Sequence, residues 1–356
     1  MKVKRKAKPL LLVIIFLVIV IMVGVGTWKF LTGPVDKKNT EDIEVVIKSG
    51  TNTSGIAKIL KDNGLIHNEK FFKLYVKIHN VKSLKAATYK LNKGMSLAEI
   101  VDELENGSNY NPDMVKLTFK EGLRITDYAK VIDTNTNNSY DDVLAIVNDE
   151  TYINELINEY WFLTDAVLDE RIYYPLEGYL APDTYHFDNR DVDVKTIIET
   201  MLDEMDKKLS KYKSVISSDV HYYLTMASIV ELEGTNTENR KMIVGIFKNR
   251  LALGMNLGSD VTTYYGLQKP MTSDLTTEEF ASINAYNTRS TTMIGKMPVG
   301  PICSAGESSI EASANPIDND YLFFVADKHG KIYYTKTNKE HDQKVAEIKK
   351  NGDWIW

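Results

Sequence analysis

The pattern of apolar and polar residues begins with an uninterrupted apolar run near the N-terminus. Residues 9–28 contain no charged side chain. A helix of this length rises about 30 Å, which matches the hydrocarbon thickness of a bilayer. A cleaved signal peptide would have a shorter apolar region, about 7–15 residues, followed by a cleavage site of small residues. This run instead ends in bulky Trp28, Phe30 and Leu31, so we favour an uncleaved membrane helix over a signal peptide.

After this run, a strand–turn–helix pattern recurs three times, beginning at residues 45, 89 and 117. In each copy a short apolar–polar alternation ends at a glycine and is followed by apolar residues three and four positions apart. This spacing is typical of a strand and then an amphipathic helix. The first two copies, with the helical segment 71–78 between them, predict a small βααβ domain over about 43–106. The polar segment 106–112 predicts a boundary, after which the third copy opens a larger domain.

The rest of the chain alternates amphipathic helices with short strands. Residues 140–172 and 193–216 have the spacing of mostly exposed helices, and residues 339–350 predict a last helix. Residues 322–326 and 331–335 flank a short turn and predict a β-hairpin. The fold class expected from these segments is α+β, with an N-terminal membrane helix, a small βααβ domain and a larger mixed domain.

Charge divides the chain at the same place as hydropathy does. The formal net charge is −6, but residues 1–8 carry five positive charges and no negative ones, so the remainder carries −11. Basic residues before a membrane helix predict a cytoplasmic tip at 1–8 and an extracytoplasmic bulk. Residues 32–42 are polar and contain Gly-Pro, and we expect a linker over 29–42. We expect no nucleic-acid partner, because nucleic-acid binding needs clustered Lys and Arg.

Cysteine content and the absence of known motifs exclude several kinds of chemistry. Cys303 is the only cysteine, so we expect neither an internal disulfide nor a cysteine-based zinc site and interpret it as a packing residue. The sequence contains no HExxH, P-loop, GxGxxG or GxSxG motif. We therefore expect no metal and no cofactor.

The helical segment 220–234 carries the most informative carboxylates. Leu224, Ala227 and Glu231 lie on one helical row, which aligns Glu231 with an apolar face in the last turn, while Glu233 points about 200° away. A carboxyl held against apolar surface has a raised pKa, as a general acid in glycoside cleavage requires. The structural alternative is a Glu at the edge of a core paired with an Arg, and helical geometry alone favours that alternative.

Three further segments combine polar and aromatic residues. The helical segment 235–254 carries Arg250, which could pair with a carboxylate or with substrate, or lie on the surface. Residues 258–266 predict a strand or loop whose hydroxyls and Tyr rings suit sugar binding, although a half-buried edge strand is the commoner alternative. The loops 174–187 and 286–302 are longer than a turn requires, and long aromatic loops are usually functional.

Taken in order, five motifs resemble those of the endolytic murein transglycosylase family, also called YceG-like. They are LEGYLAPDTYHF (176–187), ASIVELEG (227–234), IFKNRLALGMNLGSDVTTYYG (246–266), YNTR with MPVGPI (286–302) and ANPIDNDYLFFVAD (314–327). The resemblance implies a LysM-like domain at 43–110 and a YceG-like catalytic domain at 111–356. It also implies a single-pass protein of the cell membrane whose catalytic domain is extracytoplasmic.

The resemblance carries the family's catalytic Glu, which lies in its ASIVE motif, onto Glu231. It places the other motif residues in the substrate cleft: Glu177, Asp183, Glu233, Asn249, Arg250, Ser259, Asp260, Tyr265, Tyr286, Asn287 and Thr288. The sequence departs from the family pattern at Gly258 and Val261, where Gln and Pro are usual, and at Arg289, where YNTY becomes YNTR.

The reaction that the resemblance implies uses one carboxyl twice. Glu231 would protonate the glycosidic oxygen between MurNAc and GlcNAc, and would then take the proton of the C6 hydroxyl of the same MurNAc. That hydroxyl closes on C1 and leaves a 1,6-anhydroMurNAc end, so no second carboxylate is needed to direct a water. The expected result is internal cleavage of nascent strands, which limits glycan elongation.

The resemblance also implies peptidoglycan synthases of the elongation or division machinery as partners, for which the sequence shows no motif. Two alternatives stay open at this level. One is a lysozyme-like muramidase, which would hydrolyse the same bond. The other is a non-catalytic peptidoglycan-binding protein.

Overall fold

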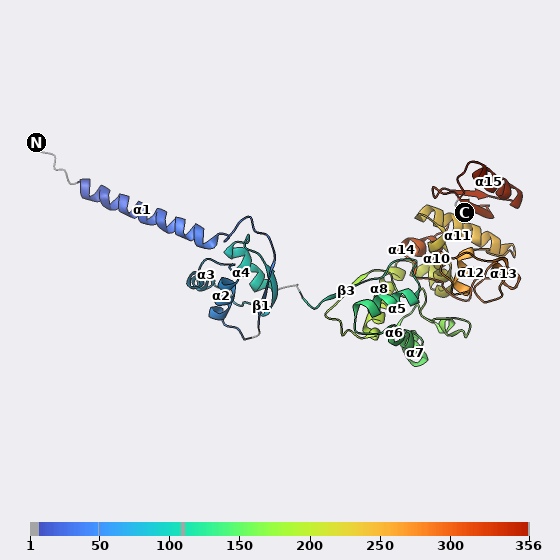
Figure 1. Cartoon of the computed structure of the whole chain (residues 1–356), viewed down its shortest axis with the longest axis horizontal. Helices are drawn as coiled ribbons and strands as arrows, with labels where there is room; N and C mark the ends of the chain where they lie inside the picture. The colour runs from blue at the N-terminus through green and yellow to red at the C-terminus, as the bar shows by residue number, and fades with distance from the viewer. Residues whose placement is uncertain (1–6, 49, 108–110, 355–356) are drawn as a thin grey trace, which may run out of the picture. The chain divides into compact units, whose positions relative to one another are not determined.

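A computed structural model describes residues 7–48, 50–107 and 111–354. The chain forms two compact units, Met1–Asp113 and Met114–Trp356 (Figure 1). The predicted basic tip, except for its last two positions, lies outside the described residues, as do residues 108–110 of the predicted boundary.

The first unit starts with the long helix α1 (Ala7–Thr32). Its segment Leu12–Thr32 is apolar enough and long enough to cross a membrane, by length and composition. The helix continues past Trp28. The prediction that the linker begins at residue 29 was wrong, because residues 29–32 are helical. The helix ends at Gly33-Pro34 because proline disfavours the helical conformation in the residue before it.

The remainder of the first unit confirms the predicted βααβ order. Strands β1 (Ile43–Ile47) and β2 (Ala87–Leu91) pair antiparallel, and α2 (Thr53–Asp62) and α3 (Glu69–Ile78) lie between them in sequence. Helix α4 (Leu97–Asn106) follows, and a capping box between Ser96 and Glu99 fixes its start. The helices and strands enclose one apolar core, whose fully buried members include Ile56, Leu60, Phe72, Tyr89, Leu91, Ile100 and Leu104.

The second unit contains two apolar cores, and the first is built mainly from residues before 225. Its elements are β3 (Val115–Thr118), α5 (Ile125–Asn135), α6 (Tyr140–Val147), α7 (Glu150–Glu159), η1 (Asp165–Leu168), β4 (Thr184–Phe187), α8 (Val194–Ser210) and α9 (Lys213–Ile216). Strands β3 and β4 pair antiparallel. The expectation of mostly exposed helices was wrong for α8, because one face from Val194 to Leu209 enters this core.

Helix α10 (Val220–Glu233) joins the two cores of the second unit. Leu224 and Ala227 belong to the first core, whereas Met226, Ile229 and Val230 belong to the second. A helix that is apolar on all sides is buried on all sides. The last turn of α10 is therefore held rigidly, and it carries both acidic residues of the ASIVELEG motif.

The second core is surrounded by the remaining elements. They are α11 (Thr237–Ala252), α12 (Asp260–Gly266), α13 (Thr277–Phe280), η2 (Thr291–Met293), α14 (Glu307–Ala314), β5 (Phe323–Ala326), β6 (Ile332–Thr335) and α15 (Asn338–Lys350). The hairpin of β5 and β6 and the last helix confirm the sequence prediction. Cys303 is a fully buried free thiol, as expected of a packing residue.

The segment 258–266 differs from its prediction as a strand or loop. It forms helix α12, with Ser259 at the N-cap. The hydroxyl of Thr262 donates to the carbonyl of Ser259 and lies 2.8 Å from the hydroxyl of Thr288. Contacts made by these β-branched residues across the fold thus override their preference for strands.

Candidate active site

The carboxylate of Glu231 is fully engaged by side chains and backbone of the second unit. Its Oε1 lies 2.7 Å from Nη2 of Arg240, and its Oε2 accepts from the amide of Gly306 (2.9 Å) and the hydroxyl of Ser309 (2.7 Å). The Glu231 and Arg240 side chains are only 7% and 13% exposed. Both carboxylate oxygens of Glu231 thus have partners within the fold. Glu231 therefore joins α10, α11 and the start of α14.

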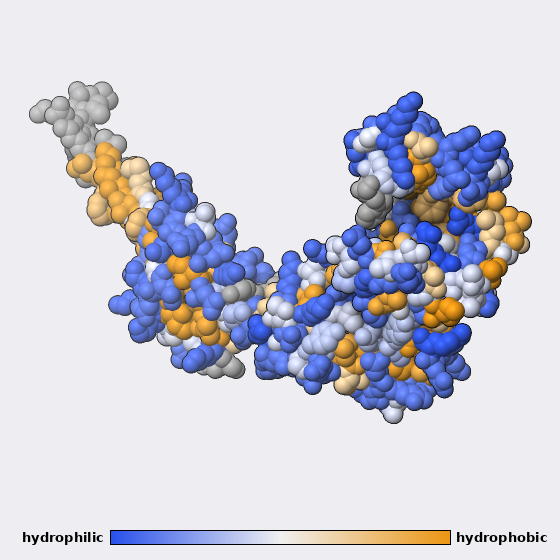
Figure 2. Space-filling view, turned by 45° about the vertical axis from the view of Figure 1, so that its right-hand side comes forward, coloured by the Kyte–Doolittle hydropathy of each residue, from blue (hydrophilic) through white to orange (hydrophobic). Residues whose placement is uncertain are grey.

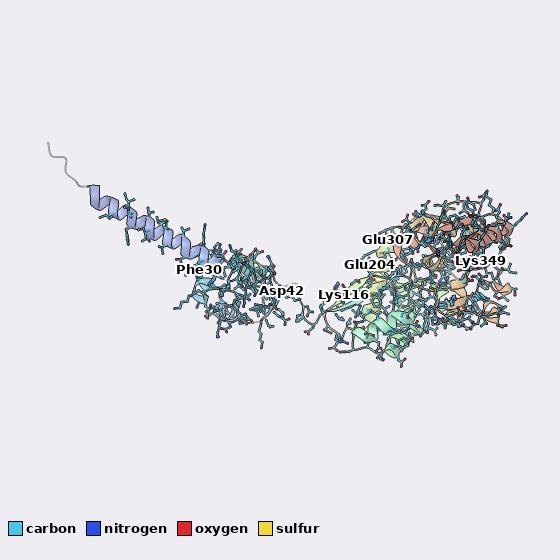
Figure 3. All side chains as sticks on the ribbon, turned by 45° about the horizontal axis from the view of Figure 1, so that its top comes forward. Phe30, Asp42, Lys116, Glu204, Glu307 and Lys349 are labelled. Atoms are coloured by element: carbon cyan, nitrogen blue, oxygen red, sulfur yellow. The ribbon has the colours of Figure 1, made fainter. Side chains whose placement is uncertain are left out.

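Arg240 can approach Glu231 because of the glycine that ends α10. A Cβ at Gly234 would lie 2.4 Å from Cγ of Arg240. Arg240 also donates to the hydroxyl of Ser308. In Figure 3 the label of the adjacent Glu307 marks this part of the molecule. The Glu231 cluster, defined as Glu231, Arg240, Gly306, Ser308 and Ser309, thus has the character of a structural ion pair.

Glu233, two residues later on α10, is in a different environment. It is half-buried, and its Oε1 accepts from the hydroxyl of Ser259 at 2.6 Å. Burial raises the pKa of the Glu233 carboxyl above its ordinary value, and the hydrogen bond from Ser259 offsets part of that rise. Nearby Asp260 raises the pKa further, while Arg289 and Arg250 lower it. A carboxyl with a raised pKa can stay protonated and act as a general acid.

Buried hydroxyls and an amide hold Ser259 in place beside Glu233. The Ser259 amide donates to the Thr288 hydroxyl at 3.0 Å, and that hydroxyl lies 2.8 Å from the hydroxyl of Thr262. Asn287 accepts from Thr263 at 2.6 Å and donates to the backbone of the 280–282 segment. Thr288 and Asn287 are fully buried. These residues therefore position the Glu233–Ser259 pair without reaching solvent themselves.

Charged side chains next to Glu233 do reach solvent. Asp260 forms an ion pair with Arg289, and their side chains are 45% and 42% exposed. Arg250 is half-buried and donates to the carbonyls of Leu322 and Leu257. The Asp260–Arg289 pair thus gives the surroundings of Glu233 a polar, accessible side on which a sugar could be hydrogen-bonded.

A second buried group of predicted site residues surrounds Glu177. Its carboxyl accepts from the amide of Ile125 and the hydroxyl of Tyr265, both at 3.0 Å. Burial raises its pKa to about 8. The Tyr265 ring packs edge-on against Tyr286, with centroids 4.7 Å apart, and both rings are buried. This group caps the start of α5 and ties α12 to the first core.

Two predicted site residues make structural contacts elsewhere. The amide of Asn249 donates to the carbonyls of Asn319 and Tyr321 and so anchors the segment before β5. Asp183 is exposed at the start of β4, where its carboxylate pairs with Lys208 of α8 at 3.4 Å. The contacts of Asp183 thus connect it to α8 and not to the residues around Glu233.

A cavity of about 960 Å³ lies beside the opposite end of α10. Its lining includes Arg171, His221 and Lys296 but none of the predicted site residues. The carboxyl groups of Glu231 and Glu233 lie at the other end of α10, away from this cavity. Across residues 7–48, 50–107 and 111–354, no group of three His, Cys, Asp or Glu side chains gathers to hold a metal ion.

Sequence analysis missed three residues that shape this region. Arg240 and Ser309 hold Glu231, and Arg289 pairs with Asp260. The only signal was for Arg289, which interrupts the aromatic pattern of its motif. Arg240 lies on another helix from Glu231, so no helical spacing could have paired the two.

A family model, related sequences and a solved structure all relate this chain to the same family. The model of the YceG-like family matches residues 45–347. A Bacillus subtilis (strain 168) protein named endolytic murein transglycosylase is 38% identical over 319 residues, covering 88% of this chain and 87% of that protein. A protein of the same name from Streptococcus pneumoniae D39 is 35% identical over 333 residues, but the chain spans only 60% of its length.

A solved structure also resembles the chain. The crystal structure of a yceG-like protein from Listeria monocytogenes is 37% identical, with a TM-score of 0.61. The match covers 85% of this chain and 99% of the Listeria chain.

Proposed function

The chain belongs to the YceG-like family, and we propose that it is an endolytic lytic transglycosylase of peptidoglycan. In this function it cleaves MurNAc–GlcNAc bonds within glycan strands, leaves 1,6-anhydroMurNAc ends and so limits strand elongation. The names of its Bacillus and Streptococcus relatives support the substrate and the reaction class. A partnership with peptidoglycan synthases stays a prediction.

The acidic end of α10 supplies the acid and base, and its contacts favour Glu233 for that role. A lytic transglycosylase needs a carboxyl that is protonated before the reaction and can take a proton back afterwards. Burial raises the pKa of Glu233, and Ser259 orients its Oε1. Glu231 instead has both oxygens occupied within the fold, by Arg240 at 2.7 Å and by Gly306 and Ser309. The assignment of Glu231 stays a prediction, and the hydrogen bond from Ser259 to Oε1 of Glu233, at 2.6 Å, is the observation that supports our choice.

Each step of the reaction balances with this single carboxyl. Glu233 donates its proton to the glycosidic oxygen, the bond from that oxygen to C1 of MurNAc breaks, and GlcNAc leaves with a free hydroxyl. The resulting carboxylate takes the proton of the C6 hydroxyl of MurNAc, whose oxygen bonds to C1. The Asp260–Arg289 pair is placed to hydrogen-bond sugar hydroxyls near this carboxyl.

The N-terminal helix suggests where the enzyme acts. The segment Leu12–Thr32 has the length and composition of a membrane span, and five basic residues precede the apolar run. We infer a single-pass anchor with a cytoplasmic N-terminus. The catalytic unit then lies on the side of the membrane where peptidoglycan is built.

Mass analysis of glycan products tests the proposal. The detergent-solubilised full chain is incubated with glycan strands. The wild type is compared with the variants Glu233→Gln and Glu231→Gln. We expect wild-type products with an anhydro end, lighter by one water than a reducing end. Glu233→Gln should lower the rate by about 10²-fold or more, because general acid catalysis contributes about 10²–10⁴-fold. Glu231→Gln should retain anhydro products at a reduced rate, with lower thermal stability.

The other outcomes identify the alternatives. Reducing ends alone from wild type would make the protein a muramidase. An active Glu233→Gln beside a folded but inactive Glu231→Gln would return the catalytic role to Glu231. Binding without any cleavage would make the protein a peptidoglycan-binding module.

A further inference from the structure

The C-terminal end of the membrane helix α1 packs against α3 of the small domain. The Trp28 ring meets Phe71 edge-on, with centroids 5.2 Å apart, and lies 6.3 Å from Tyr75. The Phe30 ring lies 4.3 Å from His67, just before α3, and the Phe30 label in Figure 3 stands at this junction. Aromatic contacts of this kind fix the two helices relative to each other.

The order of these contacts gives the direction of α3. His67, two residues before the helix, meets Phe30, whereas Phe71 and Tyr75 meet Trp28, which lies further inside the segment Leu12–Thr32. As α3 advances it therefore runs back toward the apolar part of α1. Figure 1 shows α3 on the side of this unit that faces back along α1. The C-terminal end of α3 is consequently near the level at which α1 would enter a bilayer.

Helix α3 has two apolar faces, and only one enters the domain core. Phe72 and Tyr75 are buried in the core. Leu74 and Ile78, one turn apart, are 48% and 56% exposed. Together with Phe71, which contacts Trp28, they form an apolar stripe that continues from α1. Figure 2 shows exposed apolar surface both on α1 and on the small unit beside it.

Basic side chains border this stripe. Lys70, Lys73 and Lys77 are exposed and recur every three to four residues along α3. A helix with an apolar face and flanking lysines has the character of an interfacial helix, which buries its apolar side at the headgroup boundary. Lysines near a membrane surface are attracted to anionic lipids.

We propose that the α3 stripe, Phe71, Leu74 and Ile78 with its flanking lysines, is a membrane-docking surface for anionic phospholipids. It seats the small domain on the outer leaflet next to the exit of α1, so that this domain is part of the anchor. Continuity with α1 and charge complementarity with lipid phosphate select the bilayer as the occupant. The inference rests on the proposed membrane anchor and is independent of the catalytic residue.

Spin-label depth measurement on the full chain tests the surface. Cys303 is fully buried, so single cysteines can be introduced for nitroxide labelling in an otherwise native chain. The positions are Ile78→Cys and Leu74→Cys on the stripe, Ile19→Cys within α1, and Lys58→Cys on α2 as the exposed control. Each labelled protein is placed in phosphatidylcholine nanodiscs with and without phosphatidylglycerol. Accessibility to oxygen and to a water-soluble nickel complex is then compared.

We expect the labels at positions 74 and 78 to be accessible to oxygen. Their accessibility to the nickel complex should be at least threefold lower than that of the label at position 58. Protection should be greatest with phosphatidylglycerol and should weaken in Lys73→Gln/Lys77→Gln. Nickel access at position 78 equal to that at 58, with position 19 buried in lipid, overturns the docking surface but leaves the anchor. Nickel access at position 19 overturns both. Protection from both reagents at position 78 means that protein covers the stripe and also overturns the proposal.

Discussion

At the scale of single residues, the site depends on two carboxyls that are two residues apart in sequence but differ in surroundings. Glu231 is tied to Arg240 and Ser309, while Glu233 accepts one hydrogen bond from Ser259. Burial raises the pKa of Glu233, and a carboxyl kept protonated in this way is suited to acid–base catalysis. The difference in contacts, and not the motif, is what assigns the roles proposed here.

Removing the Ser259 hydroxyl should shift the pH dependence of catalysis. The hydrogen bond from Ser259 lowers the pKa of Glu233, so Ser259→Ala raises that pKa further. Because the acid must be protonated, kcat/KM falls as pH rises through the pKa of Glu233. We expect this limb to move to higher pH in Ser259→Ala, with kcat reduced about tenfold by poorer orientation. The measurement is the pH profile of anhydro-product formation.

A matched control is available for this experiment. Ser210 donates to Asp206 on α8, outside the site, and Ser210→Ala should leave the profile unchanged. A limb that stays in place or moves to lower pH in Ser259→Ala would contradict the role given to Glu233.

Glu177 should make stability depend on pH. Its pKa is raised by burial to about 8, so between its ordinary value of 4.5 and about 8 the folded state binds more protons than the unfolded state. The free energy of unfolding therefore falls as pH rises through this window. We expect Glu177→Gln to lack this decrease and to gain a few kcal/mol relative to wild type by pH 8, since one pKa unit corresponds to about 1.4 kcal/mol.

Urea unfolding at pH 5, 6, 7 and 8 measures this difference. Asp183→Asn, an exposed carboxyl of the same motif, serves as the control and should follow wild type. Parallel stability curves for wild type and Glu177→Gln would show that Glu177 is ionised at neutral pH in the folded protein.

How much of the site could be predicted differs from residue to residue. The motifs drew attention to Glu233, Ser259 and Thr288, which are indeed linked through hydrogen bonds. They gave no sign that Thr288, Tyr265 and Tyr286 are buried, because a motif records identity and not exposure. Partners on other elements, such as Arg240, depend on tertiary packing that no local pattern contains.

At the scale of elements, segments with strong periodicity were predicted correctly. Segments whose structure depends on tertiary contacts were not. The two strands and the helices α2, α3 and α4 follow the predicted order, because caps and glycine turns mark their ends and each presents an apolar face to the core. Helix α12 was missed, since its Thr, Tyr and Val residues favour strands and only its contacts with the 286–288 segment make it a helix.

Close backbone contact at α11 gives a prediction at this scale. A Cβ at Gly245 would lie 2.3 Å from the carbonyl oxygen of Ile317. Gly→Ala in a helix interior usually stabilises by about 1 kcal/mol, but here the methyl group overlaps backbone. We expect Gly245→Ala to destabilise by about 1–3 kcal/mol, measured as a lower urea midpoint. Lys248→Ala, on the exposed side of α11, serves as the control and should change the midpoint little. A Gly245→Ala variant more stable than wild type would show that the 315–322 segment can move to accommodate the methyl group.

At the scale of the whole molecule, the distribution of charge predicts on which side of the membrane the catalytic unit lies. Five positive charges precede the apolar run and −11 follows it, which predicts a cytoplasmic N-terminus. An acidic unit facing an anionic wall gains nothing from bulk charge. We therefore expect substrate recognition to depend on local groups such as the exposed Asp260–Arg289 pair.

Cysteine labelling in intact cells tests this orientation directly. The thiol of Cys303 is fully buried, so the wild-type chain should not react with a membrane-impermeant maleimide until it is denatured. Lys58→Cys places a thiol on the exposed surface of the small domain, and we expect it to react in intact cells. Val3→Cys lies in the basic tip and should react only after the membrane is permeabilised. Reaction of Val3→Cys in intact cells, with Lys58→Cys protected, would reverse the topology and separate the catalytic unit from the wall.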